Sequence, residues 1–306
     1  MTTTDYLLCG WRVRSDLPLP ELLAWPATQD IPPDITIMQA SVPDRLENAV
    51  TQGDSFAVDA QGSALLHIKG LVRILARGGR QISVEILRRE SSESWRLFLL
   101  GSTLGHIAHQ RGLFPLHAAC LRVKERTIAI AGASGAGKST MAMALAQRGH
   151  ALLSDDLIVV RQDGFAPPQV LPAFPRLKLW RDTLDTLAVD TRMLPRVRDG
   201  MEKFNLAGAG NFGFDPAPRV LDAIFVLDEQ PVARLTPLPL LESAAAIRNQ
   251  IFRPKFGALL GNAHQARLFA QSVAIASKTR VCRLERPKIF ADLAAIVTLV
   301  EDHVAA

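Results

Sequence analysis

Cysteine is scarce in this chain, and its three cysteines lie far apart. Cys9, Cys120 and Cys282 are odd in number and form no Cys-x-x-Cys pair. Neither a disulfide framework nor a thiolate metal site is therefore suggested. We expect all three to be reduced thiols within the core.

Long apolar runs are missing as well. No stretch approaches the ~18 apolar residues that a membrane-spanning helix needs. The first residues, Met-Thr-Thr-Thr-Asp-Tyr, lack the basic and apolar parts of a signal sequence. Of the 306 residues, 48% are hydrophobic, which suffices for one large domain or two smaller ones with proper cores. We expect a globular, cytoplasmic protein without a membrane partner.

Tyrosine occurs once, and the basic residues are dispersed rather than alternating with aromatic ones. No nucleic-acid partner is therefore expected despite the net charge of +5. A mild positive field suits an anionic nucleotide and an acidic peptide equally well. Three signatures are also missing: Asn-Lys-x-Asp for guanine recognition, Leu-Ser-Gly-Gly-Gln of transport ATPases, and the combined glycine-loop and His-Arg-Asp set of eukaryotic-type protein kinases. GTPases, transport ATPases and eukaryotic-type protein kinases are therefore disfavoured.

The first part of the chain predicts a small antiparallel β domain, residues 1–92. Short alternating runs recur there, and glycines punctuate them as hairpin turns do. The proline-rich residues 17–35 predict an irregular lead-in. The predicted strands are residues 55–58, 64–68, 72–76 and 81–87.

Residues 93–306 predict a second domain with an α/β core. Apolar residues at helical spacing indicate a helix over 93–111, and two apolar runs, 115–123 and 127–131, indicate a hairpin. Residues 164–176 are expected to be a loop or an extended edge, and the Gly-rich residues 199–215 a mobile loop. Further strands are predicted at 151–153, 157–160, 223–227 and 279–284, and helices at 141–146, within 177–187, and at 243–252, 263–276 and 289–303.

The most informative motif is the run Gly-Ala-Ser-Gly-Ala-Gly-Lys-Ser at 132–139, which matches the phosphate-loop pattern G-x-x-x-x-G-K-[ST]. A predicted strand precedes it and a predicted helix follows, so backbone N–H groups and the helix N-terminus face the phosphates. We expect Lys138 to reach the β- and γ-phosphates of ATP and the Ser139 hydroxyl to ligate Mg²⁺. A chance match in a Gly/Ala-rich helix start is the alternative. The predicted nucleotide-binding residues are Gly132, Ala133, Ser134, Gly135, Ala136, Gly137, Lys138, Ser139 and Thr140.

An acid pair, Asp155 and Asp156, ends the next predicted strand. A parallel strand reached by a right-handed crossover ends on the same side of the sheet as the phosphate loop. One carboxylate can then hold Mg²⁺ while the other takes the proton of an attacking hydroxyl. The alternative is an exposed turn in which Asp serves its backbone hydrogen bonds.

His117 gains interest from the register of the predicted hairpin. Pairing around Lys124-Glu125 makes the numbers of paired residues sum to about 249 to 250, which places His117 beside Gly132 or Ala133. An imidazole there can donate to the γ-phosphate or polarise the acid pair. The alternative is a histidine satisfied within the core.

Four basic residues are further candidates. Arg176 and Lys178 lie in a basic and aromatic segment that can bind phosphate or a carboxylate, or can simply begin a solvated helix. Lys203 and Arg253 are candidates for charge stabilisation in the transition state.

Four linked motifs resemble the C-terminal catalytic domain of HPr kinase/phosphorylase. They are Leu-His-Ala at 116–118, the phosphate loop, Gln-Arg-Gly-His at 147–150 and Leu-Ser-Asp-Asp at 153–156, in the order and spacing of that family. The resemblance implies a protein serine kinase fold related in its core to phosphoenolpyruvate carboxykinase, and an oligomer. It further implies that Asp155 is the general base, that Asp156 and Ser139 serve the metal, and that His117 assists near the phosphates.

The chain departs from this family after the acid pair. The signature Glu-x-Arg-Gly-Leu-Gly has no counterpart, and Pro-Arg-Leu-Lys-Leu-Trp stands at 175–180 instead. The resemblance therefore does not extend to HPr as substrate or to the reverse phosphorylase reaction. That segment and residues 10–22 resemble those of divergent HPr-kinase-like proteins that are encoded beside lasso-peptide biosynthesis genes. Those proteins phosphorylate a serine of a precursor peptide.

Together these features predict a β-rich N-terminal domain followed by an HPr-kinase-like P-loop core. With ATP and Mg²⁺, this core would phosphorylate a serine hydroxyl of a peptide or small protein. A small-metabolite kinase and a non-catalytic nucleotide-binding module remain alternatives, although a pure binding module needs no base. We expect the peptide to dock on the N-terminal domain and on residues 199–215.

Overall fold

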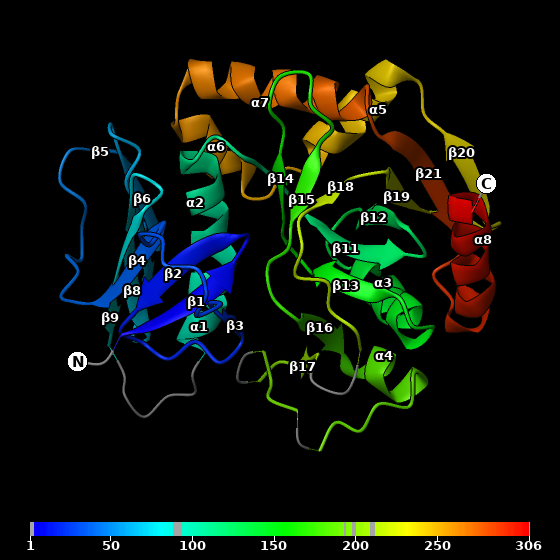
Figure 1. Ribbon diagram of the computed structural model, residues 1–306, viewed down its shortest axis with the longest axis horizontal. Helices are drawn as coiled ribbons and strands as arrows, with labels where there is room; N and C mark the ends of the chain where they lie inside the picture. Colours follow the sequence, from blue (N-terminus) through cyan, green and yellow to red (C-terminus); the bar gives the residue numbers. More distant parts are fainter. Residues whose placement is uncertain (1–2, 88–93, 193, 198–199, 209–211, 306) are drawn as a thin grey trace. The chain divides into compact units, whose positions relative to one another are not determined.

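The computed structural model describes residues 3–87, 94–192, 194–197, 200–208 and 212–305. The chain divides into two compact units, Met1–Pro115 with Arg253–Leu268, and Leu116–Phe252 with Phe269–Ala306 (Figure 1). The boundary predicted between residues 92 and 93 lies outside the described residues. The observed division falls later, because the helical residues 95–110 belong to the β-rich unit.

A mixed nine-stranded sheet forms most of the first unit, in the order β3-β1-β2-β4-β9-β8-β7-β6-β5. The strands predicted at 55–58, 64–68, 72–76 and 81–87 are confirmed as β6 to β9. The expected purely antiparallel arrangement is wrong, since β4 pairs parallel with both β2 and β9. The strands are β1 (Thr4–Leu8), β2 (Trp11–Ser15), β3 (Leu23–Ala24), β4 (Ile35–Gln39), β5 (Ala49–Gln52), β6 (Phe56–Asp59), β7 (Ala64–Ile68), β8 (Val72–Arg77) and β9 (Gln81–Ile86).

The helical segments pack on this sheet through a polar residue, Gln110, and an aromatic residue, Phe256. Gln110 donates to the carbonyls of Gly62 at 2.6 Å and Ala76 at 3.1 Å, and accepts from the Gly79 N–H at 2.9 Å. Phe256, far away in sequence, is buried in a cluster with strand residues of the same unit. Residues 253–268 therefore complete the core of the first unit. The helical segments are α1 (Trp95–Phe98), η1 (Leu99–Thr103), α2 (Leu104–Gln110) and α6 (Pro254–Leu259).

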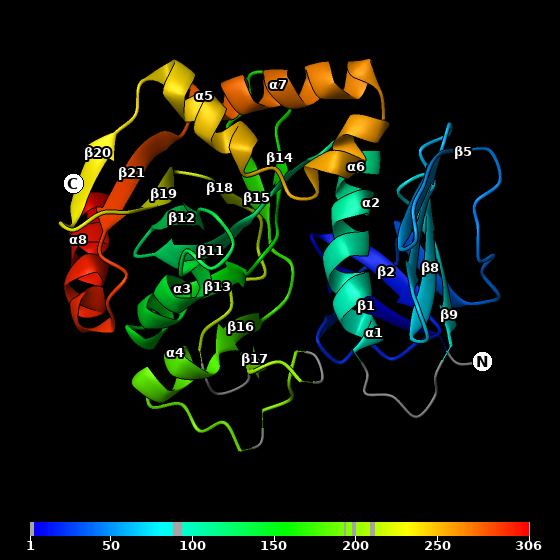
Figure 2. The ribbon, with the colours of Figure 1, turned by 180° about the vertical axis from the view of Figure 1, so that it is seen from behind.

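The second unit is built on a six-stranded sheet in the order β13-β11-β12-β19-β21-β20 (Figure 2). β12, β19 and β21 are parallel, and β13 runs in their direction because β12 and β13 are both antiparallel to β11. The carboxyl ends of these four strands therefore lie at one edge. The strands are β11 (Ala118–Val123), β12 (Arg126–Ala131), β13 (Ala151–Ser154), β19 (Ala223–Glu229), β20 (Arg234–Pro237) and β21 (Arg280–Arg286).

The predicted hairpin register is confirmed. Ala118 pairs with Ala131 and Val123 with Arg126, so the numbers of each pair sum to 249. Lys124 takes a positive φ of 53° in the two-residue turn, as this tight connection requires. His117 consequently lies one residue before the paired stretch, at the end that meets the phosphate loop.

The core of the second unit lies between the six-stranded sheet and the helices that cover it. Side chains from α3, α8 and the strands form one buried cluster, to which β16 and β17 add further apolar residues. The predicted helices are confirmed here. They are α3 (Lys138–Gln147), α4 (Arg181–Thr186), α5 (Leu240–Asn249), α7 (Asn262–Ala276, which continues from the first unit), η2 (Phe290–Asp292) and α8 (Leu293–Ala305).

Two segments contain strands that were not predicted. Residues 177–187 include the predicted short helix, but residues 176–180 before it form β16 (Arg176–Trp180), which pairs antiparallel with β17 (Lys203–Ala207) inside the supposed Gly-rich loop. The alternation of buried Leu177 and Leu179 with polar neighbours explains this pairing, because it gives the strand an apolar face. Asp199 and residues 209–211 lie outside the described residues. The remaining strands are β10 (Phe114–Leu116), β14 (Ile158–Arg161), β15 (Gln169–Leu171) and β18 (Arg219–Val220).

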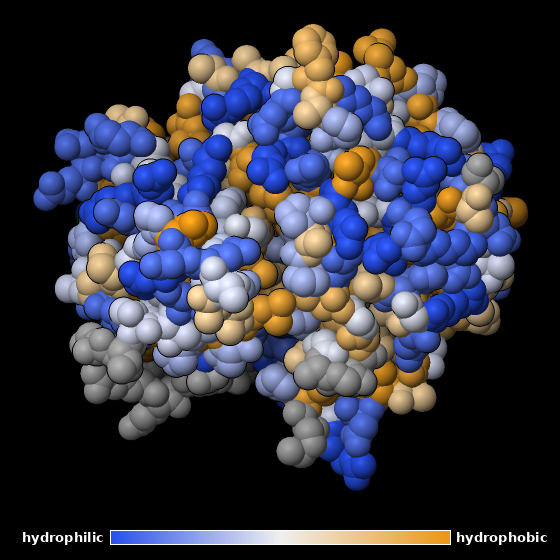
Figure 3. Space-filling model, in the orientation of Figure 1, coloured by the Kyte–Doolittle hydropathy of each residue, from blue (hydrophilic) through white to orange (hydrophobic). Residues whose placement is uncertain are grey.

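The three cysteines are buried and free. Within the described part of the chain, no helix is both long and apolar enough to cross a membrane. The face drawn in Figure 3 is mostly hydrophilic, with scattered apolar residues.

Candidate functional site

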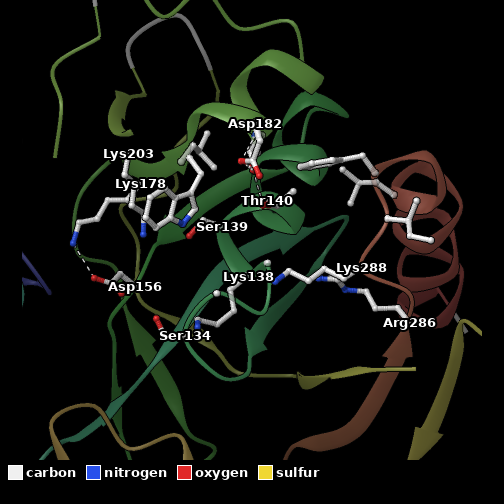
Figure 4. Close-up of a pocket in the computed structure, with 18 of the residues that line it drawn as sticks. Ser134, Lys138, Ser139, Thr140, Asp156, Lys178, Asp182, Lys203, Arg286 and Lys288 are labelled. Atoms are coloured by element: carbon white, nitrogen blue, oxygen red, sulfur yellow. Dashed lines mark hydrogen bonds and ion pairs between the residues drawn. The ribbon is translucent and has the colours of Figure 1, made fainter. Parts of the chain in front are cut away.

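A cavity of about 320 Å³ opens at the carboxyl edge of the six-stranded sheet. Three groups of side chains line it: the phosphate loop with the start of α3, His117 and Asp156 with β16 and β17, and Arg286 with the segment that follows β21 (Figure 4). Their main members are Ser134, Gly135, Gly137, Lys138, Ser139 and Thr140 in the first group, His117, Asp156, Lys178, Trp180 and Lys203 in the second, and Arg286, Lys288, Ile289, Phe290 and Leu293 in the third.

The phosphate loop has the backbone that its glycines predict. Gly135 and Gly137 take φ of 80° and 92°, in the left-handed region that glycine favours. Lys138 is buried, and its ammonium donates to the carbonyls of Gly132 at 2.9 Å and Ala133 at 3.0 Å. Burial lowers the pKa of Lys138, which the carboxylates of the acid pair partly oppose. The loop therefore keeps a cation folded against it, at the place where phosphate oxygens are expected.

Asp155 is held by two donors. The Ser139 hydroxyl donates to Oδ1 at 2.8 Å, and the Lys178 backbone N–H donates to Oδ2 at 2.9 Å. Burial raises the pKa of Asp155, and the neighbouring charge of Asp156 raises it further, against the lowering effect of the two hydrogen bonds. Both carboxylate oxygens are thus engaged, one of them by the hydroxyl of the loop.

Asp156 faces the cavity instead. Its Oδ2 lies 2.8 Å from the Lys178 ammonium, and its backbone takes a φ of 72°, which is strained for a residue with a side chain. Burial acts to raise the pKa of Asp156, but the charge and hydrogen bond of Lys178, with smaller contributions from His117 and Lys203, hold it well below the ordinary 3.8. Asp156 is therefore an ionised carboxylate at the cavity wall.

His117 lies beside this strained turn, as its register predicts. Its Nδ1 is 2.7 Å from the Asp156 carbonyl oxygen, so Nδ1 carries the proton and donates it, and it is 3.5 Å from Oδ1 of the same residue. Burial lowers the pKa of His117, and the nearby Lys138 charge lowers it further. The His117 ring therefore fixes the Asp156 backbone through this hydrogen bond.

The four additional basic candidates lie in different places, and only two of them line the cavity. Lys178 contacts both members of the acid pair, and the Lys203 ammonium lies 5.5 Å from the centroid of the Trp180 ring at the cavity wall. Arg176 lies outside the cavity lining, and its guanidinium stacks over Phe174 at 4.7 Å. Arg253 belongs to the first unit, where it donates to the Ser102 hydroxyl at 2.7 Å, so it is not part of this cavity.

Sequence reasoning missed the third side of the cavity. Arg286 ends β21 and donates to the Ala136 carbonyl of the phosphate loop. The available signal was the Arg-Pro-Lys step after a predicted strand, because parallel strands end at one edge. Asp182 and Thr183 of α4 were missed as well; the Thr183 hydroxyl lies 3.1 Å from that of Thr140.

Part of this chain is similar to known proteins of one family. Residues 111–167 match the family described as HPr Serine kinase C-terminal domain. An HPr kinase/phosphorylase of Lactobacillus acidophilus is 32% identical over 88 residues, which cover 29% of this chain. The chain spans about a quarter of that relative, 27% of its length. The HPr(Ser) kinase/phosphatase of Coxiella burnetii aligns with 62% of this chain and 96% of its own at a TM-score of 0.34 and 16% identity.

The matched residues 111–167 contain all four motifs on which the resemblance rests, from His117 to Asp156. Three of these motifs contribute residues to the cavity lining, through His117, the phosphate loop and Asp156, whereas residues 147–150 do not. The predicted likeness to the HPr kinase C-terminal-domain family is therefore confirmed over residues 111–167, where the phosphate loop and the acid pair lie.

Proposed function

We propose that this chain is a kinase that transfers the γ-phosphoryl group of ATP to a serine hydroxyl of a peptide or small protein. One observation carries the proposal: the ionised Asp156 lines the same cavity as the phosphate loop. A nucleotide-binding module needs the loop alone, whereas hydroxyl phosphorylation also needs a group that orients the acceptor and takes its proton.

The side chains present fit Mg²⁺ and a triphosphate. Ser139 offers a hydroxyl oxygen at the helix start, and Asp155 lies within a hydrogen bond of it, which is the hard oxygen donor set that Mg²⁺ prefers. When bound, Mg²⁺ neutralises charge that develops on the β- and γ-phosphate oxygens. Lys138 would exchange its two carbonyl contacts for phosphate oxygens.

The contacts support an exchange of the roles expected for the acid pair. Asp155 accepts from the Ser139 hydroxyl and is not among the residues that line the cavity, so it suits the metal beside Ser139. Asp156 lines the cavity and suits the acceptor hydroxyl, because geometry decides a general base before pKa does. A low pKa is compatible with this role, since in a loose transition state the base chiefly orients the hydroxyl. His117 then acts as a positioning residue through the Asp156 carbonyl.

The acceptor is proposed from the family likeness. The Lactobacillus relative is named an HPr kinase/phosphorylase, but the segment 175–180 replaces the signature that follows the acid pair in that family. We therefore propose a peptide acceptor of the lasso-precursor kind rather than HPr. Lys203 at this end of the cavity favours an acceptor that carries negative charge near the reacting serine, whereas the Lys178 ammonium is paired with Asp156.

Intact-mass measurement tests the proposal. The protein is incubated with Mg·ATP and, in parallel, lasso precursor peptides, HPr and a pool of hydroxyl metabolites. We expect one phosphoryl group to be gained by a precursor peptide, and the gain to disappear when its serines are replaced by alanine. Phosphate found only on a metabolite would establish the small-molecule kinase instead, and ATP binding without any phosphorylated acceptor would establish a regulatory module.

A further inference from the structure

The cavity has two chemically different ends, on either side of the phosphate loop. In Figure 4, Asp156, Lys178 and Lys203 lie on one side of the loop residues, and Arg286 and Lys288 lie on the other. The end near Asp156 holds the ion pair and the imidazole. The far end consists of Arg286, the last residue of β21, and of residues that follow it, and the proposed transfer reaction uses none of them.

The phosphate loop gives the nucleotide a direction. Ser139 and Lys138 serve the β- and γ-phosphates, and Ser139 is hydrogen-bonded to Asp155, so the γ-phosphate belongs at the acid-pair end. The α-phosphate and the nucleoside then extend away from the acid pair, toward Arg286 and Lys288. This step rests on the proposed binding of ATP.

Apolar side chains are exposed at that far end. Ile289 and Phe290 are 58% and 38% exposed, and Leu293 is buried next to them at the start of α8. All three line the cavity, although large apolar side chains are usually withdrawn from water. We call Ile289, Phe290 and Leu293 the apolar ledge. Lys288, directly before it, is exposed and lines the same cavity.

Arg286 links the ledge to the phosphate loop. Its guanidinium donates to the Ala136 carbonyl and, at 3.1 Å, to the Pro287 carbonyl. Only two residues separate Arg286 from the beginning of the ledge. The ledge therefore starts from a point fixed on the loop itself, which keeps it within reach of a nucleotide held there.

We propose that the apolar ledge is the base-binding subsite, with the adenine ring of ATP packed against Phe290 and Ile289 and with Lys288 placed for the α-phosphate. A purine offers a flat, weakly polar face to an aromatic ring, and each such stack contributes measurably to affinity. The ammonium of Lys288 complements the charge of the α-phosphate. The opposite end of the cavity, beside Asp156, then remains open to the acceptor.

Paired binding measurements test the subsite without any acceptor. The affinities of Mg·ATP and of Mg·tripolyphosphate are measured by calorimetry for the parent and for Phe290→Ala. We expect Phe290→Ala to weaken Mg·ATP about tenfold, as loss of a base–aromatic stack predicts, and to leave tripolyphosphate within about twofold. Phe165→Ala, which removes the same side chain from a fully exposed position outside this cavity, is the matched control and should change neither affinity.

A second variant covers the case in which Phe290→Ala does not fold. Phe290→Trp keeps a ring on the ledge and should give an emission change with Mg·ATP, beyond that of the parent, and none with tripolyphosphate. Equal weakening of both ligands by Phe290→Ala, or unchanged ATP affinity, would overturn the subsite.

The base-binding subsite and the proposed kinase activity can be refuted independently of each other. A parent protein that binds Mg·ATP much more tightly than tripolyphosphate through Phe290, yet phosphorylates no hydroxyl, refutes the kinase activity and leaves the subsite standing. A parent that phosphorylates a peptide but binds the two ligands equally refutes the subsite alone.

Discussion

Replacing each member of the acid pair by asparagine tests which carboxylate serves the acceptor. Asp156→Asn keeps the shape of the side chain and one acceptor oxygen for Lys178 but cannot take a proton. We expect transfer at saturating Mg·ATP to fall by about 10² or more, which corresponds to about 2.7 kcal/mol in the activation barrier. Nucleotide affinity should change little, because the contacts of Lys138 and Ser139 do not involve this carboxylate.

Asp155→Asn should behave differently, because two donors converge on the Asp155 carboxylate. The Ser139 hydroxyl and the Lys178 N–H each donate to one oxygen, and an amide offers only one acceptor. One donor then loses its partner, which costs about 1–3 kcal/mol of folding stability. We also expect a higher Mg²⁺ requirement, with much of the transfer rate restored at high Mg²⁺.

Single-turnover transfer to the identified acceptor, followed by intact mass across a Mg²⁺ series, separates the two outcomes. Thermal melting reports the stability difference. Asp185→Asn, at an exposed position of α4 outside the cavity lining, is the matched control. A larger loss of transfer for Asp155→Asn than for Asp156→Asn at saturating Mg²⁺ would refute our reasoning and restore Asp155 as the base.

Three further predictions concern the loop and the first unit. Lys138→Ala should weaken Mg·ATP binding and transfer together, and unaltered turnover would remove the loop from the mechanism. Gly137→Ala should lower both nucleotide affinity and melting temperature, because φ is 92° there and an added Cβ would collide with the Arg286 guanidinium; a variant with parent-like binding would contradict this. The hydrogen bond from Arg14, with further contributions from Arg12, lowers the pKa of Asp5 from 3.8 to about 2. A depressed carboxyl pKa stabilises the fold above the unfolded value, so the melting-temperature advantage of the parent over Asp5→Asn should be full above about pH 5 and shrink as the pH falls through 3.8 toward 2; a constant difference would contradict it.

Patterns set by neighbours along the chain were predictable from sequence. The hairpins of β6 to β9 followed from alternation and glycine turns, and the register of β11 with β12 followed from the position of one tight turn. The first hairpin, β1 with β2, was missed because Arg12 is buried despite its charge. It pairs with Asp5 at 2.7 Å, and such a pair breaks the apolar alternation on which the prediction depends.

The unit boundary depended on contacts that leave no local signal. Phe256 lies almost 200 residues from Val58 and Ala64 in sequence, yet all three share one buried cluster. Residues 253–268 therefore belong to the first unit, which no composition shift near residue 253 indicates.

The sequence by itself determined that a phosphate loop, an acid pair and a histidine converge, because the loop and the pair follow parallel strands and the histidine follows from a hairpin register. Only the tertiary structure decided how the two carboxylates differ. Pairing of β16 with β17 brings the Lys178 backbone to Asp155 and its ammonium to Asp156. Only the end of β21, about 150 residues after the loop, supplies Arg286 and the apolar ledge. Such contacts depend on how distant strands are ordered in the sheet, which local residue patterns do not encode.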